Sequence, residues 1–397
     1  MSRILKEAKN ILMVVYTDYL QDTRVRREAE TLASLPEFNV TVLSLKQNRH
    51  PSSYSVDEVQ IVELEEGKYC GKSQLRYVLS YFKFTLLSLL TCTWFFIRRK
   101  VDIIHVHNMP NFLVFAGIVP RIFGKKVILD VHDTVPETYG AKFDTYNSKL
   151  FSVLCLEERI ACAFSSKIIC VNHVQSASLV KRGIPERKIV ISMNVPDPFR
   201  FNPKMVKAHI KRKSNTFRLI YHGTIAKRLG IDLIIHAVAM LKNEIPDIEF
   251  QIWGKSGEDM DGLFRLSCEL NIRDKITFRE PVSIERLASE LINMDLGVIG
   301  NRKSMATELM LPVKMLEYVT LKIPVIAPRL KGIEYYFSDD MVTYFEPEDL
   351  ESLKNGILRL YKDRSLRKSQ AERALAFLDK YEWSNHKMDL INLYRNL

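Results

Sequence analysis

Short apolar runs alternate with stretches of helical periodicity along this chain, in two separate series. The runs are rich in Val and Ile and apolar on both faces, which is typical of parallel strands covered by helices on both sides. In the first half they occupy residues 11–16, 40–45, 101–106, 127–131, 167–171 and 189–192. Helical patterns such as 24–35 and 150–164 lie between them. This alternation predicts a doubly wound α/β domain.

The alternation stops at residues 194–215, which carry three prolines and a basic cluster and are typical of a linker. It resumes with runs at 217–221, 248–253, 275–278, 295–299, 323–327 and 341–345. We therefore predict two Rossmann-like domains, 1–200 and 201–376, followed by a C-terminal amphipathic helix within 377–397. Ligands of open α/β sheets bind at the carboxyl ends of the strands, so two such domains facing a central cleft would bind their ligands there.

Composition narrows the possible partners. The net charge of +11 favours anionic partners: nucleic acid, acidic lipid surfaces or phosphorylated small molecules. No aromatic RNA-binding motif and no zinc-finger spacing occurs, so nucleic acid is not expected. The six cysteines form no CxxC pair and suit a reducing, cytoplasmic compartment. The first ten residues, MSRILKEAKN, do not resemble a signal peptide.

One segment suggests a membrane surface. Residues 84–97 (FTLLSLLTCTWFFI) are uncharged and lie between Lys83 and the triplet Arg98, Arg99 and Lys100. A spanning helix needs about 20 apolar residues, so this shorter run favours a buried or an interfacial helix. Trp94 and its aromatic neighbours beside basic residues favour peripheral contact with the anionic inner face of the cell membrane. A buried core helix remains the alternative.

The segment ELMLPVKMLEYVTLKIPVIA, residues 308–327, has the features of an anion site. Pro312 suits the first turn of a helix spanning 312–321, whose N-terminus would offer free N–H groups to a phosphate. Lys314 in that first turn is unfavourable unless an anion binds there. Glu317 follows on the same face, where its carboxylate could accept both ribose hydroxyls of a nucleotide. A surface helix with a Lys–Glu pair is the alternative.

With its P-x-K-x-x-E-Y pattern and the following K-I-P-V-I strand, this segment resembles the group 1 type, family-4 retaining glycosyltransferases of the GT-B fold. The resemblance implies transfer of a sugar from a nucleoside diphosphate sugar. It places Glu317 on the donor ribose, Lys314 near the donor phosphates and Leu311 within the donor site. Many members carry a sugar-contacting glutamate where this chain has Leu309, and the adjacent Glu308 is our catalytic candidate here. The usual glycine before the P-V-I strand is Lys322.

Two further loops of the second domain are donor-site candidates. Between residues 223 and 230, Gly223 permits a tight turn, and Lys227 and Arg228 could hold the diphosphate. The family has an arginine and a lysine at the positions of Thr224 and Leu229, and an ordinary basic loop is the alternative. In the family, the turn that contains Pro281 and Val282 holds the nucleobase.

In the first domain, His132 and Asp133 follow a strand directly and are catalytic candidates, because the family has a histidine near the donor sugar. His107 ends the preceding strand and could line the same cleft. The DxxRVRREA pattern resembles a subgroup of the family, and Asp22, Arg24 and Arg26 are candidates for acceptor or phosphate binding. Structural loop pairs and a solvated basic helix face are the alternatives.

No metal or other cofactor is expected. Asp259 and Asp261 have the DxD form of metal-dependent transferases of another fold. They begin a helical stretch, however, where the helix dipole stabilises acidic side chains. Basic residues and helix N-termini would then stabilise the departing diphosphate.

The sequence thus predicts a hexosyl- or N-acetylhexosaminyltransferase. We expect its acceptor to be a lipid-linked glycan in surface polysaccharide synthesis. A GT-B sugar-nucleotide epimerase and a non-catalytic sugar-nucleotide-binding protein remain alternatives.

Overall fold

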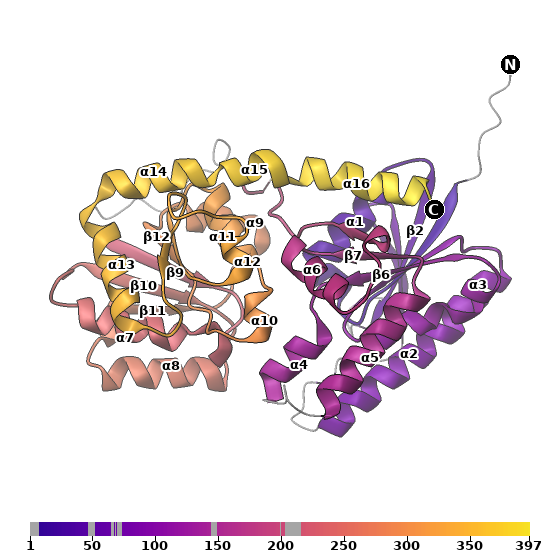
Figure 1. The fold of residues 1–397 in the computed structure, drawn as a ribbon, viewed down its shortest axis with the longest axis horizontal. Helices are drawn as coiled ribbons and strands as arrows, with labels where there is room; N and C mark the ends of the chain where they lie inside the picture. Colours follow the sequence, from indigo (N-terminus) through magenta and orange to yellow (C-terminus); the bar gives the residue numbers. More distant parts are fainter. Residues whose placement is uncertain are drawn as a thin grey trace, which may run out of the picture. The chain divides into compact units, whose positions relative to one another are not determined.

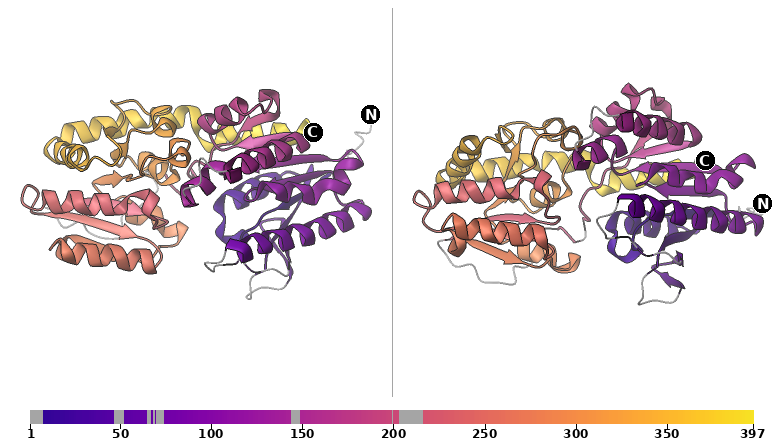
Figure 2. Two further views of the ribbon diagram at one scale, coloured as in Figure 1. Left: turned by 60° about the horizontal axis from the view of Figure 1, so that its bottom comes forward. Right: turned by 90° about the horizontal axis from the view of Figure 1, so that it is seen from below.

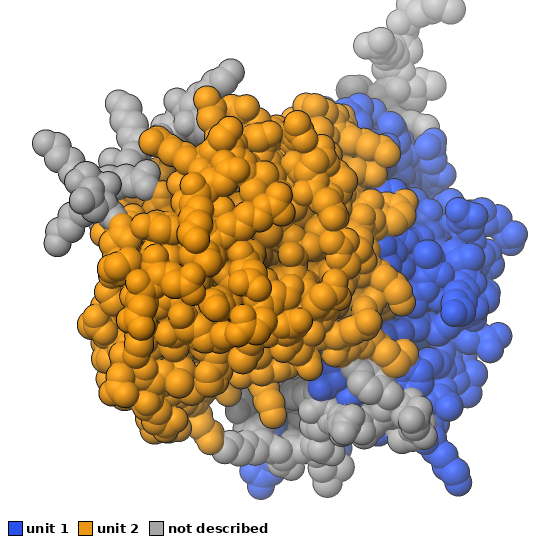
Figure 3. Space-filling view, turned by 60° about the vertical axis from the view of Figure 1, so that its left-hand side comes forward, with its two compact units in different colours: residues 1–193, 386–397 blue, residues 194–385 orange. Residues whose placement is uncertain are grey.

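The computed structural model describes residues 8–46, 52–64, 67, 69, 74–143, 149–198, 200–202 and 216–397. The chain forms two compact units, one of residues 1–193 with 386–397 and one of residues 194–385 (Figure 3). The boundaries predicted from the sequence lie at residues 200 and 377. Residues 199 and 203–215 of the expected linker, 194–215, lie outside the described residues.

Unit 1 is built on an eight-stranded sheet in the order β3-β4-β2-β1-β5-β6-β7-β8 (Figures 1 and 2). Its strands are β1 (Lys9–Val14), β2 (Phe38–Leu45), β3 (Ser53–Val56), β4 (Val59–Leu64), β5 (Ile103–His107), β6 (Lys126–Val131), β7 (Lys167–Cys170) and β8 (Ile189–Ile191). All neighbours are parallel except β3 and β4. The six predicted strands are confirmed. The β3–β4 hairpin was missed because its turn uses Asp57 and Glu58, both in the left-handed region, in place of the usual Asn-Gly.

Helices cover both faces of this sheet (Figure 1). They are α1 (Thr23–Ala33), α2 (Gln74–Ile97), α3 (Ile118–Ile122), α4 (Val135–Phe143), α5 (Lys149–Phe164), α6 (His173–Lys181) and the end of α16 (Trp383–Arg395). Side chains of α2 and α5 share one core with Ile104 and Val106. On the opposite face, the buried Tyr394 of α16 lies with its hydroxyl oxygen 2.6 Å from Nδ1 of His105.

Unit 2 has a six-stranded, wholly parallel sheet in the order β11-β10-β9-β12-β13-β14. Its strands are β9 (Phe217–His222), β10 (Ile248–Trp253), β11 (Ile276–Arg279), β12 (Leu296–Val298), β13 (Val325–Pro328) and β14 (Thr343–Phe345). The helices are α7 (Ile231–Leu241), α8 (Glu258–Glu269), α9 (Ile284–Leu291), α10 (Met305–Glu308), α11 (Val313–Thr320), α12 (Lys331–Glu334), α13 (Leu350–Lys362), α14 (Arg364–Ala374) and α15 (Ala376–Tyr381). Both sheets are doubly wound, as predicted.

Each sheet has a point where the strand order reverses, between β1 and β5 in unit 1 and between β9 and β12 in unit 2. Loops that leave the carboxyl ends of such strand pairs diverge to opposite faces and leave room for a ligand. Most candidate residues end or follow β1, β5 and β6 in unit 1 and follow β9 and β12 in unit 2, whereas Pro281 and Val282 follow β11. The fold therefore places them where doubly wound sheets bind ligands.

Helix α2 is longer than the sequence analysis expected, with 24 residues from Gln74 to Ile97. Its stretch Val78–Ile97 is long and apolar enough to cross a membrane by length and composition, and a third of the most apolar window is buried. The expectation of a short helix was wrong because Ser80, Tyr81 and Lys83 interrupt the apolar run without ending the helix. The helix also packs on the core of unit 1 through Phe84, Cys92 and Phe95.

Candidate functional site

In unit 2, a carboxylate and an imidazole meet where β9 ends. Oε2 of Glu317 lies 3.0 Å from Nε2 of His222, and each residue is only 8% exposed. Glu317 stands on α11, whose N-cap is Pro312, so the helix predicted at 312–321 is confirmed. His222 is the last residue of β9 and was not predicted as a site residue. Its position at the end of a strand, directly before Gly223, was the available signal.

Lys314 lies in the first turn of α11 and is partly buried. Its ammonium nitrogen is 3.7 Å from the centre of the Tyr221 ring. Burial lowers the pKa of Lys314 to about 7, Glu317 opposes this shift by attraction, and Arg228 adds to it. Gly223, at φ 105°, leaves open the space beside this ammonium, since a Cβ there would lie 3.5 Å from Nζ. A cation held this way, at a helix N-terminus, is suited to receive an anion.

The loop that carries Lys227 and Arg228 is fixed by residues that the sequence analysis missed. Arg302 donates to the backbone carbonyl of Lys227 at 2.6 Å and forms two bonds of 2.9 and 2.7 Å with the carboxylate of Asp232. The backbone N–H of Arg302 also donates to the carbonyl of Arg228 at 2.9 Å. The Lys227 and Arg228 side chains remain exposed at this ordered loop.

The other donor-site candidates occupy loops of the same unit. Glu308 ends α10 and is partly buried, with its carboxylate oxygens 3.8 Å from the amine of Lys303 and 3.5 Å from that of Lys331. Leu311 lies between α10 and α11, and Pro281 and Val282 follow β11. Their ligand contacts remain predictions.

In unit 1, most of the predicted site residues line one cavity of about 200 Å³. Its walls include Asp22, Arg24, His107, His132 and Asp133, together with Val15, Tyr16, Thr17, Tyr81, Asn108 and Met109. Asp22 caps α1 and pairs with Arg24 at 3.3 Å. The structure does not bring Arg26 to this cavity: its guanidinium pairs with Glu30 at 2.8 Å and with Asp57 at 3.5 Å.

Behind this cavity, three atoms form a buried triangle. Nδ1 of His107 and Nε2 of His132 lie 3.0 and 3.1 Å from Oδ2 of Asp130, and 3.0 Å from each other. Burial lowers the pKa of His107 to about 3, and the neighbouring His105 adds to this shift against the attraction of Asp130. Asp130 was missed, although it lies on β6 two residues before His132, and residues two apart in extended backbone point to the same side.

Comparison with known proteins finds two matching family models. Residues 205–377 match the model described as glycosyl transferases group 1, and residues 21–197 match glycosyltransferase family 4. One component of the human phosphatidylinositol N-acetylglucosaminyltransferase is 22% identical over 272 residues, which cover 66% of this chain and 51% of that protein. The matched part spans about half the length of the curated relatives.

Solved structures agree on the fold. Sucrose-phosphate synthase from Thermosynechococcus elongatus superimposes with a TM-score of 0.79 at 16% identity and 98% coverage of both chains. Anabaena HepE, solved in complex with UDP-glucose, gives a TM-score of 0.71 at 13% identity over 98% of this chain and 99% of that one. At such identities the likeness establishes the GT-B architecture.

Proposed function

Since the chain belongs to the family-4, group 1 glycosyltransferases with the GT-B fold, we propose that it transfers a sugar from a nucleoside diphosphate sugar with retention at the anomeric carbon. The bond between C1 of the sugar and the phosphate oxygen breaks, and its electrons stay with the diphosphate. The acceptor oxygen bonds to C1, and its proton passes to the released phosphate. The sugar is of the hexosyl or N-acetylhexosaminyl class.

The observation that carries this proposal is the Glu317, His222 and Lys314 cluster at the strand-order reversal of unit 2. His222 holds one oxygen of Glu317, and the two carboxylate oxygens together can accept both ribose hydroxyls. Lys314 and the N–H groups that begin α11 face the diphosphate, and Arg228 lies on the loop beside them. Fixed positive groups of this kind stabilise the charge that develops on the leaving diphosphate, so we expect transfer without a metal ion there.

Thermal unfolding tests this donor site. UDP-, GDP-, ADP- and dTDP-sugars would be compared on the wild type, on Glu317→Ala and on Glu269→Ala, a carboxylate variant on the exposed end of α8. We expect one nucleotide class to stabilise the wild type and Glu269→Ala, by about 2.7 kcal/mol at a hundredfold excess over the dissociation constant. Glu317→Ala should lose the shift. An equal shift in both variants would refute the ribose role, and turnover with acceptor separates transfer from epimerisation or mere binding.

For the acceptor, the surface of unit 1 supports a lipid-linked glycan at the cytoplasmic face of the cell membrane. Apolar side chains on α2 recur every three or four residues with about half or more of their surface exposed, which makes one continuous stripe. They are Leu79, Phe82, Leu86, Leu90, Trp94 and Ile97. On α5 the exposed side chains are Leu150, Val153, Leu156 and Ile160.

Basic residues stand at the end of this stripe. The guanidinium of Arg98 lies 4.8 Å from the centre of the Trp94 ring, and Arg99 and Lys100 follow directly. Patches of exposed apolar surface with cations at their rim are typical of proteins that lie on anionic membranes. A protein held there would meet an acceptor whose lipid is embedded in the same surface.

A further inference from the structure

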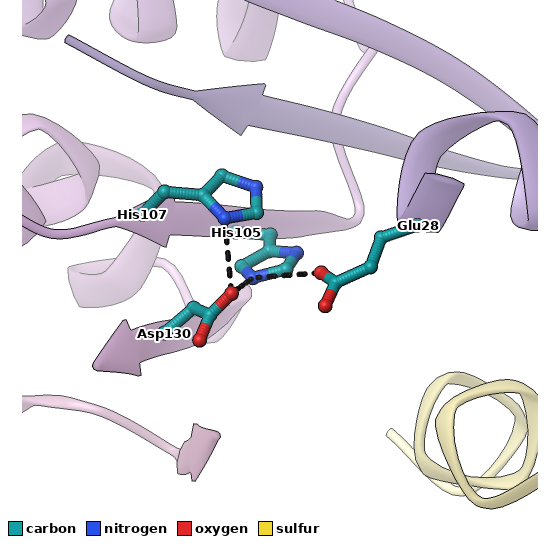
Figure 4. A group of neighbouring side chains, drawn as sticks. All are labelled: Glu28, His105, His107 and Asp130. Atoms are coloured by element: carbon teal, nitrogen blue, oxygen red, sulfur yellow. Dashed lines mark hydrogen bonds and ion pairs between the residues drawn. The ribbon is translucent and has the colours of Figure 1, made fainter. Parts of the chain in front are cut away.

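Five polar side chains are gathered inside unit 1, beyond the wall of the cavity. Glu28 comes from α1, His105 and His107 from β5, Asp130 from β6, and His132 from the loop directly after β6. All five are buried, and His105, His107 and Asp130 are at most 1% exposed. Figure 4 shows four of them pointing toward one another across two strands and a helix. No local sequence pattern groups these residues, and none of them was predicted to bind a metal.

These side chains have more polar atoms than the described residues can satisfy. Within the part of the chain that the structure describes, five of their buried atoms have no hydrogen-bond partner: Oε2 of Glu28, Nε2 of His105, Nε2 of His107, Oδ1 of Asp130 and Nδ1 of His132. An unsatisfied buried polar atom destabilises the fold, because it has lost its hydrogen bonds to water and gained none in return. Two of these atoms, Oε2 of Glu28 and Nε2 of His105, lie 4.0 Å from each other, and a cation that accepts their lone pairs would satisfy both.

The spacing of the donor atoms fits a small cation. Nδ1 of His107 lies 3.0 Å, and Nε2 of His105 3.6 Å, from Oδ2 of Asp130, and Nε2 of His105 lies 4.0 Å from Oε2 of Glu28. One donor atom from each of these four residues lies within 4.8 Å of all the others. Around Zn²⁺, with bonds of about 2.0–2.2 Å, tetrahedral ligand atoms stand about 3.3 Å apart, so small side-chain shifts would close the shell.

We propose that Glu28, His105, His107 and Asp130 form a closed binding site for one divalent cation, with Zn²⁺ the ion best suited to this donor set. Two imidazoles and two carboxylates match the nitrogen and oxygen ligands that Zn²⁺ takes. The two positive charges balance two carboxylates that are buried side by side, which otherwise costs free energy. Four protein ligands leave no open coordination position, which makes the site structural.

Neighbouring residues hold the ligands in place. The hydroxyl of Tyr394 lies 2.6 Å from Nδ1 of His105, so in the tautomer with a proton on Nδ1 the Nε2 lone pair faces the cation. Nε2 of His132 lies 3.1 Å from Oδ2 of Asp130 and connects the site to the cavity. The cation would therefore join α1, β5 and β6, with Tyr394 of the C-terminal helix α16 against its ligand His105. This site is independent of the donor site in unit 2.

Elemental analysis tests the site on the untagged full chain, expressed in minimal medium with added zinc or cobalt. We expect about one equivalent of zinc per chain, and for the cobalt form an intense visible absorption typical of tetrahedral coordination. Asp130→Asn and Glu28→Gln keep the shape of each ligand but remove its charge, and should each reduce retention at least about tenfold. Glu158→Gln replaces a buried carboxylate elsewhere in unit 1 and should keep the full equivalent.

Two results would overturn the proposal. Wild-type chain with well under one equivalent in both media would show that the cluster is a proton-sharing network of histidines and carboxylates. Metal kept equally by Asp130→Asn, Glu28→Gln and Glu158→Gln would show binding elsewhere on the chain. If either ligand variant fails to fold, the metal content and cobalt spectrum of the wild type decide alone. Neither the metal content nor the cobalt spectrum depends on transferase activity. The metal site and the proposed function are therefore tested separately.

Discussion

Lys314 makes donor binding depend on pH. Its pKa in the free protein is lowered to about 7, so above this value most molecules present a neutral amine to the donor. A bound diphosphate attracts the charged form and raises the pKa again, so binding takes up a proton. We therefore expect the dissociation constant of the intact nucleotide sugar to rise above pH 7, by up to about tenfold per pH unit. Titration calorimetry between pH 6 and 9 measures this dependence.

The matched variant is Lys314→Arg, because arginine stays charged throughout this range. Its dissociation constant should be almost flat with pH. The same lowered pKa has the opposite consequence for folding. Between pH 7 and about 10 the amine of Lys314 is protonated in the unfolded chain but mostly neutral in the folded one. The contribution of Lys314 to the free energy of unfolding therefore rises with pH across that window. A wild-type profile as flat as that of Lys314→Arg would show that the ammonium does not meet the diphosphate.

Lys322 occupies the position of a family glycine, and the structure shows what the glycine is for. Helix α11 ends with the N–H of Ile323 bonded to the carbonyl of Tyr318 and that of Lys322 to the carbonyl of Val319, which is a Schellman motif. Lys322 accordingly takes φ 57°, a conformation that glycine adopts without strain. We expect Lys322→Gly to stabilise unit 2 by about 0.5–1 kcal/mol in urea unfolding. Lys322→Ala keeps the strain and should gain nothing; equal stability of all three chains would contradict this account.

At the scale of elements, two loops of unit 2 touch through glycines. Gly230 has φ 63°, and a Cβ there would lie 1.9 Å from the carbonyl oxygen of Gly300. Because the obstacle is backbone, Gly230→Ala must push the loops after β9 and β12 apart and should cost at least about 2 kcal/mol. Gly262→Ala, in the open middle of α8, should instead gain up to about 1 kcal/mol. Chemical unfolding of both variants compares them, and an equal effect would exclude a tight contact.

The elements also show what sequence patterns can and cannot reveal. Short apolar runs predicted every described strand except β3 and β4, because the residues that form such a run are neighbours in the sequence. The β3–β4 hairpin escaped because its strands are half polar and its turn lacks glycine. The helix positions of Lys314 and Glu317 followed from Pro312 and from the family resemblance.

Contacts between distant segments could not be predicted in this way. Glu317 meets His222, and Arg302 meets Asp232, because β9 and β12 are neighbours in the sheet, and no sequence pattern states the strand order. The same holds for Asp130 with His105 and His107, which depends on β5 lying beside β6. Local sequence patterns therefore predict individual candidate residues, but not the partners that orient them.

For the molecule as a whole, charge and exposed apolar surface act together. In the proposed membrane contact, the net charge of +11 would attract the chain to anionic lipid over a distance set by salt, whereas the exposed apolar side chains of α2 and α5 would bind only on contact. Electrostatic attraction alone would disappear in high salt. Insertion of apolar side chains would leave a salt-resistant part, and the two contributions can be separated by experiment.

We expect the purified chain to bind vesicles containing anionic lipid more strongly than neutral ones, with part of the binding surviving high salt. Leu86→Glu and Leu90→Glu remove inserted side chains worth roughly 1.5–3 kcal/mol each and add a repelled charge, so each should weaken binding at least about tenfold. Met388→Glu makes a similar change on α16, which packs on the opposite face of the sheet from α2, and should lose little. Vesicle sedimentation measures all three. If Met388→Glu weakened binding as much as Leu86→Glu, only net charge would matter, and the α2 stripe would have to contact another surface.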